Sequence, residues 1–152
     1  MWRILGLVFK GDKLALVDTP HKKFKLADIK ELLNQKGIAL YDTATEVNRL
    51  NNNASDKFLE IITPTDIASL LKHIPLCSAV CATGGKAAEE LSRQLNVEVP
   101  QTGGSTSFTA NGQSIKFYRM PSSSRAYPMS VEKKAEFYRR MFIETGILPN
   151  QS

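Results

Sequence analysis

The run Met120-Pro121-Ser122-Ser123-Ser124-Arg125 holds the side chains with the clearest potential for binding chemistry. It follows residues 115–119, which are typical of a β-strand, and it precedes a helical pattern. Hydroxyl and backbone N–H groups donate to phosphate oxygens without carrying charge, and an arginine adds a charged fork. The run therefore predicts a phosphate-binding loop that uses Ser122, Ser123, Ser124 and Arg125. A plain surface turn between a strand and a helix is the alternative.

A second candidate is the turn Thr83-Gly84-Gly85-Lys86, which lies between a predicted strand and a predicted helix. Glycines allow a ligand to approach the backbone closely, and a helix N-terminus attracts anions. The spacing GxxxxGK[ST] of a nucleotide-binding P-loop is absent. Two interpretations stay open, which are a phosphate contact by Lys86 and a tight turn whose glycines serve backbone geometry alone.

Asp42 is the catalytic candidate, because it comes directly after a predicted buried strand. A carboxylate in that place can act as a general base, and it can equally cap the turn that follows. No Ser-His-Asp set is expected. His21 lies in an exposed basic run, and His73 lies at the end of a predicted helix.

The two cysteines, Cys77 and Cys81, lie four residues apart in an apolar run. A strand would place both on one face. A metal site needs further ligands, and the chain holds only two histidines. We predict that both thiols are buried as small hydrophobic groups, with a redox or metal role as the alternative. No metal and no cofactor are expected.

The chain has 152 residues, of which 42% are hydrophobic and 23% are charged. These values predict one globular domain over residues 1–145, followed by a tail over residues 146–152. No apolar run approaches the roughly 20 residues that span a bilayer, and residues 2–9 are too few for a signal peptide. We expect a cytoplasmic protein without membrane contact.

The net charge is +5, and the basic residues are concentrated near the C-terminus. Seven basic and two acidic side chains in residues 115–140 account for the whole excess. A local positive field beside a hydroxyl-rich loop favours a polyanion as partner. A solvated basic helix face is the alternative.

Helical patterns and apolar runs alternate along the chain. Residues 1–9 fit a helix, although nothing precedes Trp2 that could cap it, and a short β-run is the alternative. Further helices are predicted at residues 25–36 before Gly37, from Thr63-Pro64-Thr65-Asp66 to Pro75, from Lys86 to Leu95, and after Ser130 as the cap.

Strands are predicted at residues 38–41, 77–82 and 115–120, with polar residues 42–53 and irregular residues 97–113 between them. This alternation predicts an α/β fold with a mostly parallel sheet and helices on both faces. Sites in such sheets lie at the carboxyl ends of strands. The loops after Tyr41, Ala82 and Met120 could therefore converge on one cleft.

Four blocks together resemble the uracil-DNA glycosylase superfamily, most closely its hypoxanthine/deoxyinosine and mismatch-type branch. They are residues 37–42, 64–71, 85–88 and 120–124, and they occur in the order and at the spacing of the family across roughly residues 1–145. The resemblance implies a three-layer α/β/α sandwich around a central, mostly parallel sheet.

The resemblance also implies a function in base excision repair. Such enzymes flip a deaminated base, uracil or hypoxanthine, out of duplex DNA and hydrolyse its N-glycosidic bond. By resemblance, Ser122, Ser123 and Ser124 would hold phosphate, and Arg125 would lie at the minor groove. Relatives often carry an apolar residue or proline where this chain has Arg125.

The family's first strand, its pocket loop and its water-positioning Asn precede the helix that residues 1–5 resemble, so we expect all three to be absent from the chain as printed. An exposed sheet edge and oligomerisation through it would follow. Three functions stay open: a glycosylase-like protein, a non-catalytic module that binds DNA or another polyanion, and a phosphate-ligand domain that uses Gly84, Gly85 and Lys86.

Overall fold

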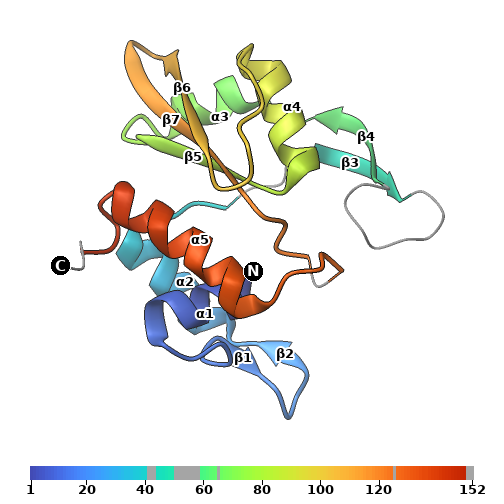
Figure 1. Cartoon of the computed structure of the whole chain (residues 1–152), viewed down its shortest axis with the longest axis vertical. Helices are drawn as coiled ribbons and strands as arrows, with labels where there is room; N and C mark the ends of the chain where they lie inside the picture. Colours follow the sequence, from blue (N-terminus) through green and yellow to red (C-terminus); the bar gives the residue numbers. More distant parts are fainter. Residues whose placement is uncertain (41–43, 50–58, 65, 125, 150–152) are drawn as a thin grey trace. The chain divides into compact units, whose positions relative to one another are not determined.

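The computed structural model describes residues 1–40, 44–49, 59–64, 66–124 and 126–149, with the backbone alone for 44–49 and 59–64. The fold is mixed α/β, and contacts group the chain into two compact units. The first unit joins Met1–Tyr41 to Pro128–Ser152, and the second is Asp42–Tyr127 (Figure 1). A single domain over residues 1–145 stays a prediction.

The first unit is helical, with a small hairpin. Helix α1 (Trp2–Lys10) confirms the helical interpretation of residues 1–9 over the β-run. It starts at Met1 without a side-chain cap and ends at Gly11, whose φ of 70° is left-handed. Strands β1 (Val17–Asp18) and β2 (Lys23–Phe24) pair in antiparallel fashion.

Helices α2 (Leu26–Lys36) and α5 (Val131–Glu144) confirm two further predictions. Gly37 ends α2 with a φ of 66°, and the Ser130 hydroxyl caps α5 by accepting the N–H of Lys133 at 3.2 Å. Helices α1 and α5 pack together, with the rings of Phe9 and Phe142 5.0 Å apart between centroids. The unit is therefore built around apolar helix faces.

The predicted strand at residues 38–41 is wrong where the structure describes it. Residues 38–40 form no strand, and Leu40 is 44% exposed. Tyr41 lies outside the described residues. A short apolar run becomes a strand only when a neighbouring strand pairs with it, and no described strand does so here.

The second unit begins with an antiparallel pair, β3 (Ala44–Arg49) and β4 (Leu59–Pro64). Helix α3 (Ile67–His73) starts later than predicted, because Thr63 and Pro64 belong to β4 and Asp66 is the N-cap. Strand β5 (Ala79–Thr83) and helix α4 (Gly85–Leu95) follow close to the predicted positions. Strands β6 (Ser105–Ala110) and β7 (Gln113–Met120) complete the unit. The polar residues 42–53 thus include a strand, which the sequence did not indicate.

The main sheet has three strands in the order β5-β7-β6. Strands β5 and β7 are parallel, as predicted, but β6 pairs with β7 in antiparallel fashion. The prediction of irregular structure over residues 97–113 is therefore wrong for β6. Asn111 and Gly112 both have positive φ, 53° and 75°, which is the conformation of a two-residue hairpin turn.

Helices α3 and α4 pack against one face of this sheet. Their buried cluster is Ile67, Leu71, Ala82, Ala88, Leu91, Phe108, Ile115 and Phe117. The side chain of Asp66 caps α3 by accepting the N–H of Ser69 at 3.3 Å. A helix layer on one face is thus established, whereas the three-layer sandwich stays a prediction. None of the helices in the described ranges combines the length and apolar character needed to cross a membrane.

Candidate nucleic-acid interface

The two sequence-predicted loops start side by side at the carboxyl ends of neighbouring parallel strands. Thr83 ends β5 and pairs in register with Met120, which ends β7. The N–H of Gly84 then donates to the carbonyl oxygen of Met120 at 3.0 Å. The turn that carries Lys86 and the loop that carries the serines are therefore joined by a hydrogen bond. We call them the paired loops, residues 83–86 and 120–124.

Gly84 gives the first of the paired loops its shape. Its φ of 123° and ψ of 168° lie in a region that only glycine populates readily. Gly84 is the N-cap of α4, and among the described residues no side chain caps this helix or adds an acidic group to its first turn. Gly84 thus has a geometric role, and no side chain in the described part of the chain neutralises the positive end of the α4 dipole within that turn.

Lys86 lies in the first turn of α4 and is half-buried. Its charge adds to the positive potential at the helix start. One turn later, Glu90 forms an ion pair with Arg93, and hydrogen bonding from Arg93 is the main reason that the pKa of Glu90 is lowered, with a smaller contribution from Lys86. Glu90 is therefore paired with Arg93, and the exposed Glu89 is a second acidic residue one turn from Lys86.

The three predicted serines differ in what their hydroxyls do. The buried Ser122 accepts the N–H of Ser124 through its hydroxyl oxygen at 3.1 Å, and the Ser124 hydroxyl accepts the N–H of Ala126 at 3.3 Å. These bonds fold the loop onto itself. The half-buried Ser123 makes no hydrogen bond to another described residue. Ser123 is thus the serine whose hydroxyl best suits an external phosphate.

Two predicted site residues lie outside the described part of the chain. They are Arg125, the expected minor-groove residue, and Asp42, the catalytic candidate. The loop after Tyr41, expected to join the other two, begins at the same undescribed residues. The structure therefore places Lys86 and Ser122–Ser124 in two loops that one backbone hydrogen bond joins. The predictions for Arg125 and Asp42 stay predictions.

The sequence analysis did not single out Arg119 as a site residue. Its guanidinium donates through Nη1 to the carbonyl oxygen of Pro100 at 3.2 Å. Its Nη2 lies 3.1 Å from the position that a Cβ on Gly85 would take, so Gly85 leaves space for this cation. Ile115, Phe117 and Arg119 share one face of β7, and this alternation is the signal that places Arg119 beside α4.

The Nε atom of Arg119 is buried and finds no hydrogen-bond partner within the described ranges. A buried donor of this kind is costly unless something satisfies it. Arg119 therefore places a second cation next to Gly85 and the first turn of α4, close to Lys86. Together with the helix dipole, the paired loops form a site that favours an anion.

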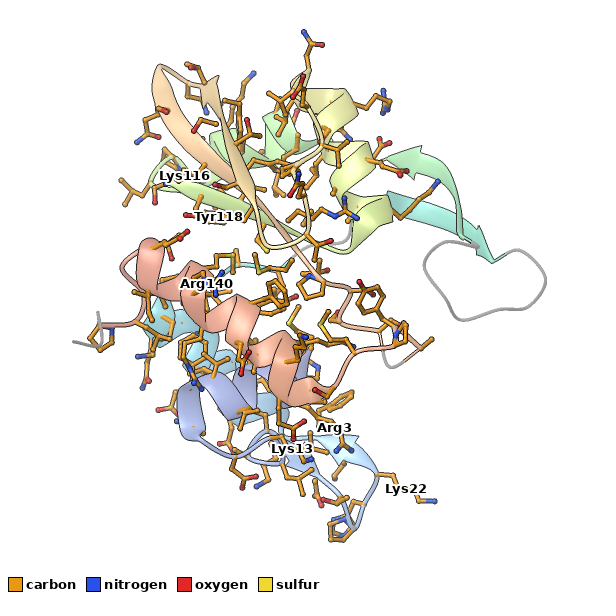
Figure 2. All side chains as sticks on the ribbon, viewed as in Figure 1. Arg3, Lys13, Lys22, Lys116, Tyr118 and Arg140 are labelled. Carbon is orange, nitrogen blue, oxygen red and sulfur yellow. The ribbon has the colours of Figure 1, made fainter. Side chains whose placement is uncertain are left out.

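The basic segment at residues 115–140 divides between the two units. Lys116 lies in the middle of β7, four residues before Met120, with its ammonium 6.0 Å from the ring centroid of Tyr118 (Figure 2). Lys134, in the first unit, is only 3% exposed, and burial lowers its pKa. Lys134 is thus not part of a solvated basic helix face, which was the alternative for this segment.

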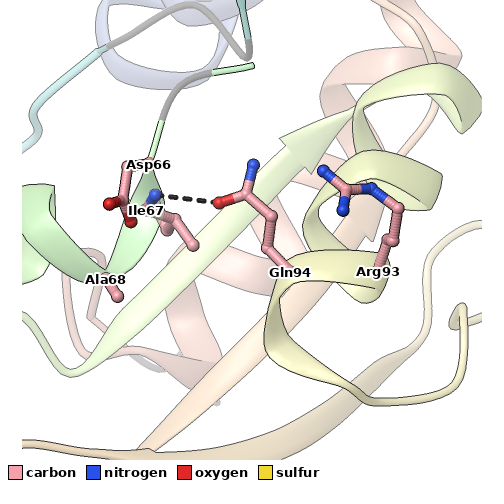
Figure 3. Close-up of a pocket in the computed structure, with 5 residues that line it drawn as sticks. All are labelled: Asp66, Ile67, Ala68, Arg93 and Gln94. Carbon is pink, nitrogen blue, oxygen red and sulfur yellow. Dashed lines mark hydrogen bonds between the residues drawn. The ribbon is translucent and has the colours of Figure 1, made fainter.

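An open pocket of about 320 Å³ lies at the other end of α4. Asp66, Ile67, Ala68, Arg93 and Gln94 line it (Figure 3). Its polar groups serve the fold: the N–H of Ile67 donates to Oε1 of Gln94 at 3.0 Å, and Asp66 caps α3. Hydrogen bonds from Ser69 lower the pKa of Asp66. With these groups already engaged, the pocket offers no second candidate site.

Both cysteines are only half-buried, so the prediction of two buried thiols is confirmed in part. Cys77 lies against the hydrophobic cluster of the second unit, and its Sγ donates to the carbonyl oxygen of Ala79 at 3.1 Å. Burial raises the pKa of Cys81 to about 12. No group of three or more His, Cys, Asp or Glu side chains arranged to hold a metal ion occurs among the described residues.

No protein-family model, curated protein or solved structure matches this chain. The geometry of the paired loops therefore carries the functional argument.

Proposed function

We propose that this chain is a DNA glycosylase-like protein of base excision repair that holds duplex DNA through the paired loops. The observation that carries the proposal is the hydrogen bond from Gly84 to Met120, which fixes the serine loop next to the start of α4. Phosphate oxygens would accept from the Ser123 hydroxyl and from the free N–H groups of the first turn of α4. Lys86 and Arg119 would supply charge.

The chemistry proposed for such a protein is hydrolysis of the N-glycosidic bond of a deaminated base, uracil or hypoxanthine. Flipping the base from the duplex costs a few kcal/mol, which contacts to the flanking phosphates can offset. Asp42 stays the catalytic candidate within this chain. The proposal includes a three-layer sandwich with a mostly parallel sheet, an oligomer through a sheet edge, and a cytoplasmic location.

A labelled-duplex experiment tests this function. Duplexes with uracil, hypoxanthine or a mismatch are incubated with the protein, and both binding and alkali-sensitive abasic sites are measured. Preferential binding to a damaged duplex, or release of the base, supports the proposal. Equal binding to damaged and undamaged duplexes, with no base release, would instead identify a non-catalytic DNA-binding module.

The phosphate-ligand alternative is favoured by one observation, the uncapped start of α4 beside Lys86 and Arg119. A small phosphate ester could occupy that position alone. This alternative predicts that millimolar inorganic phosphate displaces bound DNA, and that affinity does not increase with duplex length. A length-dependent affinity that phosphate does not reduce beyond the effect of ionic strength excludes it.

Replacing Ser123 and Arg125 with alanine together should weaken duplex binding several-fold and reduce its salt dependence. The physical reason is the loss of one neutral and one charged phosphate contact. Fluorescence anisotropy over a salt series measures both quantities. Lys72→Ala is the matched control, because Lys72 is exposed on α3 in the same unit and away from the paired loops. Unchanged binding by the double variant contradicts the assignment of the serine loop.

A further inference from the structure

The β1–β2 hairpin of the first unit carries three lysines and an exposed aromatic ring. Lys22, Lys23 and Lys25 lie within residues 19–27, which contain no acidic residue. Phe24 is 58% exposed and Leu26 is 60% exposed. An exposed apolar patch rimmed by polar groups can mark an interaction site, and here two exposed apolar side chains lie two residues apart among cations. The hairpin, residues 17–26, is therefore a candidate interaction surface.

The hairpin is an ordered scaffold. Val17 pairs with Phe24, and Asp18 pairs with Lys23. The N–H of Lys22 donates to the carbonyl oxygen of Thr19 at 3.1 Å, and the N–H of Lys25 donates to that of Leu16 at 2.9 Å. Leu16 and Val17 are buried and anchor the base of the hairpin. The cations are thus presented from a fixed backbone.

The tip of the hairpin has its own stabilising contacts. Lys22 has a left-handed φ of 52°, and Nδ1 of His21 lies 2.9 Å from the carboxylate of Asp18. Asp18, the nearest acidic residue before the three lysines in the sequence, is thus paired with His21 of the same hairpin. Asp28, in the first turn of α2, is the next acid and is exposed. The lysines between these two acids keep a local excess of positive charge.

The ring of Phe24 is held in place by a second aromatic residue. Trp2 contacts it edge-on, with centroids 6.4 Å apart and an interplanar angle of 66°. An edge-on contact of this kind fixes the orientation of both rings. Phe24 is still more than half exposed, so part of the ring remains open to a stacking partner. Figure 2 shows Lys22 projecting from this hairpin and Arg3 on α1.

We propose that the β1–β2 hairpin binds single-stranded nucleic acid. Proteins that bind single strands combine backbone-neutralising cations with aromatic rings on which unpaired bases stack. In this hairpin the ring and the cations lie within four residues. Neighbouring strand residues point to opposite faces, so Lys23 adds to the local positive field from the face opposite Phe24. The phosphates of a strand stacked on the ring would be attracted by the combined charge of Lys22, Lys23 and Lys25. A duplex offers the same charge but hides the faces of its bases. This surface goes beyond the proposed function because it uses no residue of the paired loops.

The single tryptophan of the sequence makes the proposal directly testable. Because Trp2 contacts Phe24, a base that stacks there should quench the Trp2 fluorescence. A titration of the full chain with oligo(dT) should therefore show saturable quenching. A variant with Lys86→Ala and Ser123→Ala should show the same quenching, since it alters only the paired loops. Binding seen by anisotropy without any change at Trp2 overturns the proposal.

Two ring variants separate stacking from simple burial. Phe24→Leu should weaken oligo(dT) binding by at least about five-fold, because base–aromatic stacking contributes ~1–3 kcal/mol per base. Phe24→Tyr should bind within about two-fold of the original, since it keeps the ring. Circular dichroism checks that both variants fold. Equal affinity of Phe24→Leu and the original protein contradicts the proposal.

Two charge variants test the role of the lysines. Lys22→Gln with Lys23→Gln should reduce the salt slope by roughly 1.4, at about 0.7 per cation for single strands. The matched control is Lys10→Gln with Lys30→Gln, which removes the same charge from exposed residues of the same unit. An equal reduction in the control assigns binding to net charge and overturns the proposal. If anionic vesicles quench the Trp2 fluorescence and oligo(dT) does not, the hairpin binds a membrane surface and the proposal of nucleic-acid binding is overturned.

Discussion

At the scale of single residues, a few positions in the paired loops have a geometry that admits little variation. Gly84 combines a positive φ with an extended ψ, and its N–H joins the two paired loops. Ser123 and Lys86 belong to the two loops that this hydrogen bond joins. Ser122 and Ser124, by contrast, use their hydroxyl oxygens to accept N–H groups inside the loop. The three serines of one run therefore have different roles.

Gly84→Ala should lower the free energy of unfolding by roughly 1–3 kcal/mol, because an alanine Cβ is strained at this φ and ψ. Chemical denaturation measures the change. Gly37→Ala is the control. An alanine is less strained at the left-handed φ of 66° of Gly37, so this variant should lose about 1 kcal/mol of unfolding free energy. Equal losses in the two variants would mean that the Gly84 backbone relaxes without strain.

The Cys81 thiol should resist alkylation at pH 8. Its pKa of about 12 keeps the thiol protonated, and the thiolate is the reactive form. Iodoacetamide labelling of a Cys77→Ser variant, followed by mass spectrometry, should be slow until denaturant is added. Rapid labelling of the folded protein contradicts this burial.

The raised pKa of Cys81 makes the stability of the protein depend on pH. The unfolded thiol ionises near its usual pKa of about 8.5, whereas the folded thiol ionises only near pH 12. The unfolded state therefore binds fewer protons between these values, so the free energy of unfolding should fall as pH rises from about 9 to 12. A Cys81→Ala variant should show a smaller fall. An identical fall in both proteins rules out Cys81 as its source.

At the scale of elements, the helices follow from local sequence more closely than the strands do. Caps and stops such as Ser130, Asp66 and Gly37 act within one turn, so they can be recognised without knowledge of the fold. Strand β6 depends on pairing with β7, and its hydroxyl-rich residues gave no apolar signal. The Asn111-Gly112 turn was the local sign of that hairpin.

The candidate site was predictable in part for the same reason. The order of strand, glycine turn and helix is local, and it placed Lys86 and the serines in loops at strand ends. That the two loops are neighbours follows from the parallel pairing of β5 and β7, which was also expected. The place of Arg119 beside Gly85 depends on side-chain packing, which motifs alone do not give.

Removing the cap of α5 tests how much local signals contribute to stability. Ser130→Ala should lower the free energy of unfolding by about 1 kcal/mol, because the N–H of Lys133 loses its acceptor. Thermal or chemical unfolding measures this loss. Ser114→Ala, at an exposed position of β7, should change stability by less than about half as much. A Ser130→Ala protein as stable as the original would show that the cap contributes nothing.

At the scale of the whole molecule, charge and fold are distributed over two units. Lys116 and Arg119 belong to the second unit, whereas Lys134 and Arg140 belong to the first, and Lys134 is buried. DNA binding is proposed for the paired loops of the second unit, and binding of single strands for the hairpin of the first.

The salt dependence of duplex binding tests the central claim about the paired loops most directly. Affinity for a short undamaged duplex is measured over a salt series for the original protein, for Lys86→Ala with Ser123→Ala, and for the control Lys72→Ala. The account predicts that the paired-loop variant loses several-fold in affinity and about 0.9 in salt slope, the value for one lysine on duplex DNA, whereas Lys72→Ala changes little. Equal affinity and slope in all three proteins would contradict the account.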